Sequence, residues 1–118
     1  MRGTMLIFRP HEMNTQVVEF DHAVTLEQLK DGIGGGYIEI VPGFHSIIHG
    51  DVVMKCVAFC DEDGKRKGLE VNNRASLAWE AALRRTGASL LRPDGTASDW
   101  LVGSVTVLFG DREFMEAL

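Results

Sequence analysis

Short apolar runs alternate with turn-forming segments along the first third of the chain, and each run predicts one element of secondary structure. The apolar and β-branched runs 5–8 and 16–20, separated by a segment with turn chemistry, predict two strands that can pair as a hairpin. Thr25 and Gln28 then form a capping-box pattern, which predicts the start of a helix. Three glycines end that helix, and the run 37–41 predicts the next strand before a proline.

The middle of the chain carries a hairpin pattern. Residues 43–50 have no clean hydrophobic period and predict a loop, whereas residues 52–60 are apolar and β-branched enough for a strand. An acidic turn at 61–64 and the short run 69–71 complete what we expect to be a β-hairpin.

A second helix and a last strand are predicted in the final third. Asn72 or Asn73 is placed to cap the helix, and Gly87 is placed to stop it. Between them, apolar side chains recur at the spacing of one buried helical stripe, namely Ala75, Ala78, Trp79, Ala82 and Leu83. After a Pro-Asp-Gly turn, the run 100–109 predicts a strand, and Asp111 can cap a short helix at the end of the chain.

Together these elements predict an α+β fold with the order β-β-α-β-β-β-α-β-α. A single small mixed or antiparallel sheet packed with two or three helices is the simplest architecture for this order. A chain of 118 residues buries one hydrophobic core, and no linker or repeat divides it, so we expect one domain over residues 1–118.

The net charge and the two cysteines limit the partners and the cellular compartment that we expect. The chain has 17 acidic and 12 basic side chains, a net charge of −5, and no basic tract, so direct binding to duplex nucleic acid is not expected. No apolar run approaches the roughly 20 residues of a membrane span. Cys56 and Cys60 lie in one predicted strand, about 13 Å apart and too far for a disulfide. A reducing, cytoplasmic location is therefore expected, and we expect the apolar run near Met1 to be too short for a signal peptide.

Three stretches of the sequence occur in an order that resembles a known family. They are Gly-Gly-Tyr-Ile-Glu-Ile-Val at 35–41, an acidic turn leading to Gly-Leu-Glu-Val-Asn-Asn-Arg-Ala at 61–75, and Leu-Val-Gly-Ser-Val-Thr-Val-Leu at 101–108. The chain resembles a small uncharacterised family, a domain of unknown function carried mostly by bacteria, phages and plasmids. The resemblance implies a fold and no activity. In that family the third strand runs more directly into the hairpin, so features particular to this chain are expected at 43–51.

The strand-to-helix turn at Asn72, Asn73 and Arg74 is a candidate ligand site. Backbone amides at a helix start and an arginine guanidinium can together hold an anion, and Lys65 and Lys67 on the preceding hairpin can add positive charge. The sequence thus allows a small anion or nucleotide binder at this turn. The competing interpretation is a capping asparagine followed by a surface arginine.

A metal site is a second alternative. His45 and His49 are four residues apart, as are Cys56 and Cys60, and these four side chains are of the types that zinc prefers. The cysteines fall in a predicted strand instead of a tight knuckle, however, and free cysteines are commonly buried in cores. We expect no cofactor if the core interpretation holds.

No catalytic signature is present, which favours a binding or interaction protein over an enzyme. With the resemblance, this predicts an accessory or counter-defence protein of a mobile element that occupies a protein partner. A homodimer is also compatible with the sequence, because a small sheet has edges to cover and symmetric dimers are common.

Overall fold

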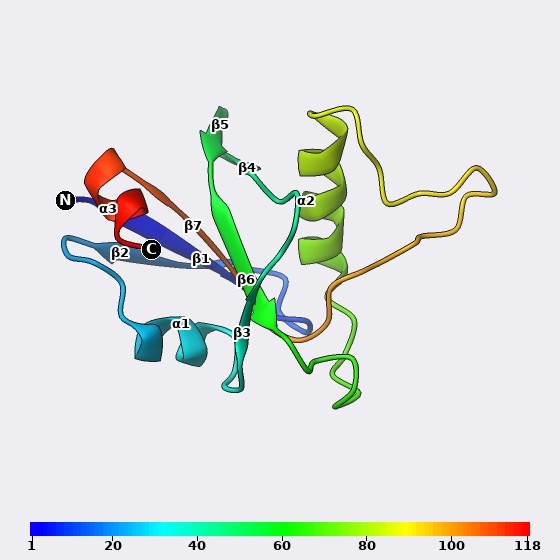
Figure 1. Ribbon diagram of the computed structural model, residues 1–118, viewed down its shortest axis with the longest axis horizontal. Helices are drawn as coiled ribbons and strands as arrows, with labels where there is room; N and C mark the ends of the chain where they lie inside the picture. Colours follow the sequence, from blue (N-terminus) through cyan, green and yellow to red (C-terminus); the bar gives the residue numbers. More distant parts are fainter.

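The computed structural model describes residues 1–118 and has a five-stranded antiparallel sheet at its centre (Figure 1). The strand order is β2-β1-β7-β6-β3, so β2 and β3 are the edges. The five strands are β1 (Gly3–Phe8), β2 (Gln16–Phe20), β3 (Ile38–Ile40), β6 (Val57–Asp61) and β7 (Val105–Gly110). A separate hairpin pairs β4 (Ser46–His49) with β5 (Val52–Lys55).

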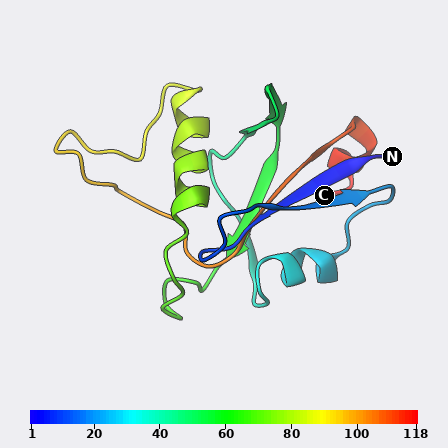
Figure 2. The ribbon, with the colours of Figure 1, turned by 180° about the vertical axis from the view of Figure 1, so that it is seen from behind.

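Three helices complete the fold, namely α1 (Leu26–Gly32), α2 (Asn73–Arg84) and α3 (Arg112–Glu116). The views from the front and from behind place α2 and the β4–β5 hairpin apart from α1 and α3 (Figure 2). None of these helices combines the length and the apolar character that a membrane span requires.

The sheet is buried on both faces, because two hydrophobic clusters lie on its opposite sides. In β1, Leu6 and Phe8 belong to the cluster that includes Trp79 of α2, while Met5 and Ile7 belong to the other cluster. Helices α1 and α3 contribute side chains to that other cluster, where Phe114 is completely buried. Because alternate residues of a strand point to opposite faces, the continuous apolar run of β1 is explained by its central position.

The predicted α+β class is confirmed, and helices and strands follow one another as the pattern indicates. The stretch between α1 and α2 is divided differently in detail. Residues 43–50 are not only a loop, because β4 lies within them and turns into β5 at Gly50, whose positive φ of 61° favours glycine. The predicted strand 52–60 is two strands, interrupted at Cys56, where the amide donates to the carbonyl of His45.

Two further predicted strands differ from the structure, and the hairpin expected between 52–60 and 69–71 is wrong, because β6 pairs with β3 and β7 instead. The run 69–71 forms no strand, and only Val71 makes an isolated bridge, with Val102. The run 100–109 becomes a strand only at Val105, because Gly103 has a positive φ of 68° that extended strands do not adopt. The yellow-to-orange chain that follows α2 therefore extends away from the sheet as a long loop before β7 (Figure 1).

The predicted helix starts are confirmed. Thr25 and Gln28 form the complete capping box of α1, and Asp111 caps α3 by accepting from the amide of Phe114. Of the two candidates at α2, Asn72 is the cap, and its side chain accepts from the amide of Ala75 at 3.1 Å.

Asn72 also ties α2 to the sheet. Its side-chain nitrogen donates to the carbonyls of Phe8 and Gly103, both at 2.8 Å, and its amide donates to the carbonyl of Leu101, also at 2.8 Å. Ser76, one turn further, donates to the Asn72 carbonyl and accepts from the Leu101 amide. Because Asn72 is only 1% exposed, water cannot replace these bonds.

Substituting Asn72 with alanine should lower the free energy of unfolding by about 3 kcal/mol, because it removes a helix cap and leaves two buried carbonyls without a donor. Asn72→Asp, which keeps the cap oxygen but removes the donor, should also be destabilising. Urea unfolding measures both. The neighbouring exposed Asn73→Ala should change stability by less than about 0.5 kcal/mol. Equal losses of stability in Asn72→Ala and Asn73→Ala would contradict the assignment of Asn72 as the helix cap.

Candidate functional site

Helix α2 has a hollow on each side. The first, which we name the α2–hairpin cleft, has a volume of about 440 Å³ and lies between α2, the β1–β2 strands and the β4–β5 hairpin. Its lining includes Leu6, Phe8, Ile47, Ile48, Arg74 and Arg85. The second, which we name the α2–loop groove, has a volume of about 520 Å³ and is lined by Val71, Asn73, Leu77, Arg84, Leu91 and Trp100, among others.

The α2–loop groove is apolar and open to solvent. Four of its large apolar side chains, Val71, Leu77, Leu91 and Trp100, are 47%, 70%, 46% and 42% exposed. They come from the chain before α2, from α2 itself and from both arms of the loop that follows it. Glu80 holds this loop close to the helix, because its carboxylate accepts from the Leu90 amide at 2.8 Å. The groove is therefore built by tertiary contacts.

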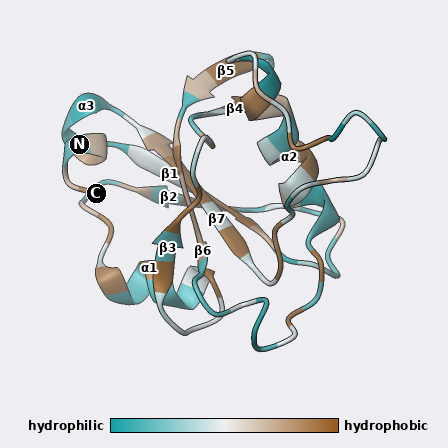
Figure 3. Cartoon of the chain, turned by 45° about the vertical axis from the view of Figure 1, so that its right-hand side comes forward, coloured by the Kyte–Doolittle hydropathy of each residue, from teal (hydrophilic) through white to brown (hydrophobic).

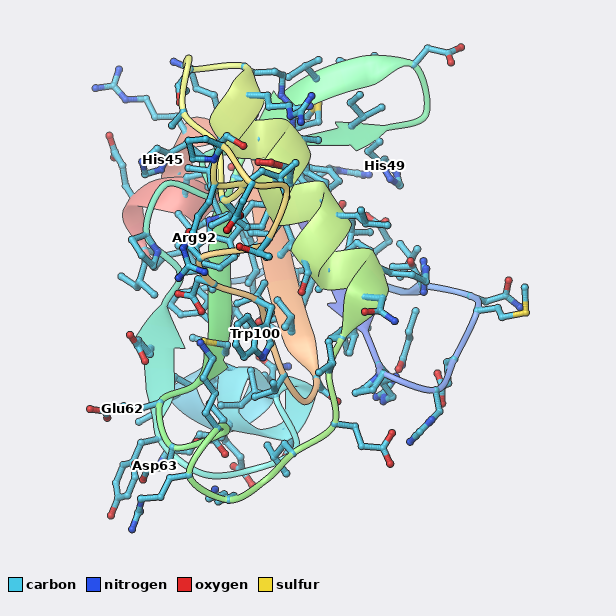
Figure 4. All side chains as sticks on the ribbon, turned by 90° about the vertical axis from the view of Figure 1, so that its right-hand side faces the viewer. His45, His49, Glu62, Asp63, Arg92 and Trp100 are labelled. Atoms are coloured by element: carbon cyan, nitrogen blue, oxygen red, sulfur yellow. The ribbon has the colours of Figure 1, made fainter.

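Trp100 is held in place by an ion pair beside it. The Lys65 ammonium contacts the Asp99 carboxylate and lies 4.8 Å from the centre of the Trp100 ring, a cation–π arrangement (Figure 4 labels Trp100). This fixes the orientation of a large aromatic ring at the edge of the groove.

The α2–hairpin cleft has a different character, because α2 presents one stripe of side chains to it. Arg74, Ala78, Ala81 and Arg85 line the cleft at the i, i+4, i+7 and i+11 positions of a single helix face. None of the 12 residues that line the cleft is acidic.

The residues that the sequence predicted for an anion site are not brought together. Asn72 is buried and fully used as a cap, Asn73 lies at the α2–loop groove, and Arg74 faces the α2–hairpin cleft. Arg74 donates to the Glu12 carbonyl and the Thr15 hydroxyl. The three residues of the predicted turn therefore lie in three separate surroundings.

The two lysines are paired with carboxylates instead. Lys65 pairs with Asp99, and the Lys67 ammonium lies 2.6 Å from a carboxylate oxygen of Asp61. Burial by itself would raise the pKa of Asp61, but hydrogen bonds from Lys67 and from the Asp63 amide, together with nearby positive charge, outweigh it and lower the pKa. Lys67 therefore stabilises the 61–68 turn itself, and Lys65 connects that turn to the loop before β7.

Replacing Lys67 with methionine should destabilise the protein by about 2 kcal/mol at about pH 7, because Asp61 stays buried without its cation. The folded-state pKa of Asp61 is lowered, so the ion pair stabilises above about pH 4 and its contribution is lost as the pH falls through that lowered pKa. Urea unfolding at about pH 7 and about pH 3 should show the difference from the wild type shrinking in acid. An unchanged difference would contradict the pairing, and Lys55→Met, at an exposed lysine that forms no ion pair, is the matched control.

The four candidate zinc ligands do not form a metal site. No group of three or more His, Cys, Asp or Glu side chains in the structure could hold a metal ion. Figure 4 shows His45 and His49 on opposite sides of α2 in that view. His49 packs against the Phe109 ring, with 5.1 Å between ring centres, and the Cys56 thiol is buried against the Phe44 carbonyl. Their i, i+4 spacing is therefore not a ligand spacing in this fold.

Both cysteines are in surroundings that suppress the thiolate. Burial raises the pKa of Cys56 to about 12, against a smaller opposing effect of Arg85. Burial raises the pKa of Cys60 to about 11, with a further increase from Glu39 and other nearby carboxylates.

Neither thiol of the folded protein should react readily with a disulfide reagent at about pH 8, and rates below about a hundredth of that of free cysteine are expected. Unfolding in urea should release two equivalents of reactive thiol. Thiols that became reactive on adding a metal chelator, without urea, would instead support zinc ligation.

Residues that matter for the two hollows were missed by the sequence pattern. Arg85, Leu77, Leu91 and Trp100 were not among the predicted site residues, although they line the cleft or the groove. Leu77 did give a signal, because it is an apolar residue outside the predicted buried stripe of α2. A leucine on the polar face of a predicted helix indicates apolar surface that the core does not cover.

Fold and hollows together define a small α+β domain whose longest helix separates a cleft with two arginines from an apolar groove. The chain belongs to the DUF3846 family, a domain of unknown function, whose model matches residues 1–116. The resemblance to an uncharacterised domain family is thereby confirmed. No curated protein matches the chain, and no solved structure does.

Proposed function

We propose that this domain is a binding module that holds a protein partner in the α2–loop groove. The observation that carries the proposal is the gathering of four partly exposed apolar side chains, including Leu77 and Trp100, around one hollow. Contiguous exposed apolar surface of this kind marks interaction sites in soluble proteins.

The groove also has the features of an energetically effective interface. A tryptophan at the edge of a pocket is the type of residue that most often dominates binding energy. Because Lys65 and Asp99 already hold the Trp100 ring, little conformational entropy is lost when a partner covers it. Asn73 and Arg84 at the rim supply polar groups that can fix the partner's orientation.

An accessory or counter-defence role for a mobile element fits this mode of action, because such a protein can work by occupying its target. The support for that setting is the family resemblance of the sequence. A cytoplasmic location fits the two free cysteines.

Leu77→Glu should weaken partner binding at least about tenfold, because it places a charge in the apolar groove and removes a leucine contact. Leu77 is 70% exposed, so folding should be unaffected. Tagged wild type, Leu77→Glu and the matched surface control Leu26→Glu would be purified from the native host and the recovered proteins quantified. A partner that co-purifies with the wild type and with Leu26→Glu but not with Leu77→Glu would then be purified, and its affinity for the three chains measured.

Binding can be followed directly by tryptophan fluorescence. The emission of the half-exposed Trp100 should shift to the blue when the partner covers it, whereas Trp79 is already buried. A partner retained in full by Leu77→Glu would contradict the proposal. If sedimentation showed that the recovered partner is a second copy of the chain, the groove would be a homodimer interface instead.

A further inference from the structure

The α2–hairpin cleft combines an apolar floor with unpaired positive charge. The whole chain carries a net charge of −5, yet the residues that line this cleft include two arginines and no carboxylate. The chain forms nine ion pairs, and neither Arg74 nor Arg85 takes part in any of them. An acidic protein has thus kept two guanidinium groups free of carboxylates at one hollow.

Both guanidinium groups are positioned and retain donors. Arg74 donates to two groups of the loop before β2 and lies over the Phe8 ring, 5.2 Å from its centre. Arg85 donates to the hydroxyl of Ser46 at 2.7 Å and to its carbonyl at 3.1 Å. A guanidinium has five N–H donors, so three of each arginine remain for a ligand. Since the neighbouring backbone holds both side chains, little ordering is required when an anion binds.

The space between the arginines is apolar. Ala78 and Ala81 lie between them on the helix, and their short side chains leave room above a floor of Leu6, Phe8 and Ile47, which are themselves largely buried. At 1.5 Å per residue, the two arginine Cα atoms are about 16 Å apart along α2. On the hairpin side, Ile48 is 57% exposed, and Figure 3 colours much of β4 and β5 as hydrophobic. The volume of about 440 Å³ falls in the range of small-molecule sites.

We propose that the α2–hairpin cleft binds a small amphipathic anion, with its apolar body on the floor of the cleft and its carboxylate or phosphate on Arg85. Charge selects the anion, because no acidic side chain lines the cleft to repel it. The apolar body supplies most of the affinity through burial. The cleft and the α2–loop groove share no lining residue, so the site does not depend on the groove.

Three probes separate the contributions of the apolar body and of the charge. Decanoate carries both the apolar body and the charge, inorganic phosphate carries the charge alone, and decylammonium carries the body with the opposite charge. Calorimetric titration should show saturable decanoate binding with a dissociation constant below about 1 mM, and binding of the other two at least about tenfold weaker. Amide chemical shifts should change at Ala78, Ala81 and Ile48 when decanoate is added.

Substitutions test whether the residues that line the cleft bind decanoate. Arg85→Gln, at an exposed side chain whose loss should leave the fold intact, is expected to weaken decanoate binding at least about tenfold. Ala81→Leu, which fills the cleft without changing charge, should weaken it similarly. The matched control Arg92→Gln, on the distant loop, removes the same charge and should leave the affinity within about twofold.

Several results would overturn the proposal. The absence of saturable decanoate binding, or decylammonium binding as tight as that of decanoate, would show that the cleft does not select an amphipathic anion. An equal loss in Arg92→Gln and Arg85→Gln would reduce the effect to net charge. Shifts confined to Leu77 and Trp100 would place decanoate in the α2–loop groove instead.

Discussion

The position of α2 depends on the hydrogen bonds of one buried side chain, that of Asn72. It caps the helix at Ala75 and at the same time donates to the end of β1 and to the turn at Gly103. Those three segments are far apart in the sequence. A side-chain amide can connect them because its oxygen accepts a hydrogen bond while its nitrogen donates two. Ser76 extends the connection to the Leu101 backbone one turn later. The first turn of α2 is thereby fixed to the sheet, and the helix orientation follows.

Fixing α2 in this way determines both hollows. One face of the helix packs Trp79 and Ala82 into the core, which leaves the faces on either side for the cleft and the groove. On the hairpin side, small alanines and the two arginines face the β4–β5 hairpin. On the other side, Leu77 faces the loop that Glu80 holds close to the helix. The two surfaces therefore share a rigid support but have opposite chemistry, and each can be disrupted without the other.

Local patterns in the sequence predicted the parts of the fold that depend on local interactions. The strand at 16–20, the capping box at Thr25 and the cap at Asp111 depend on neighbouring residues, and the structure has all three. The division of 52–60 at Cys56 depends on a bond to His45, eleven residues earlier, which no periodicity contains. The hollows were missed for the same reason, because their walls come from segments that only the folded chain brings together. The anion site was expected at Asn72, Asn73 and Arg74 because the start of a helix offers backbone amides to an anion as well as a position for a cap.

The way the cations are used explains why we propose an anion site at Arg74 and Arg85 of the cleft and not at Lys65 and Lys67. Lys65 and Lys67 are neutralised by Asp99 and Asp61, and a ligand would have to break those pairs before it gained its own. Arg74 and Arg85 are held by a hydroxyl and by backbone carbonyls, which fix a guanidinium without cancelling its charge. A cationic side chain that is already paired with a carboxylate gains little binding energy from a second anion. A positioned cationic side chain without such a partner gains the full charge-assisted hydrogen bond. Positive charge alone is therefore not the basis of the proposed anion site; its basis is that the two arginines are positioned without an internal carboxylate.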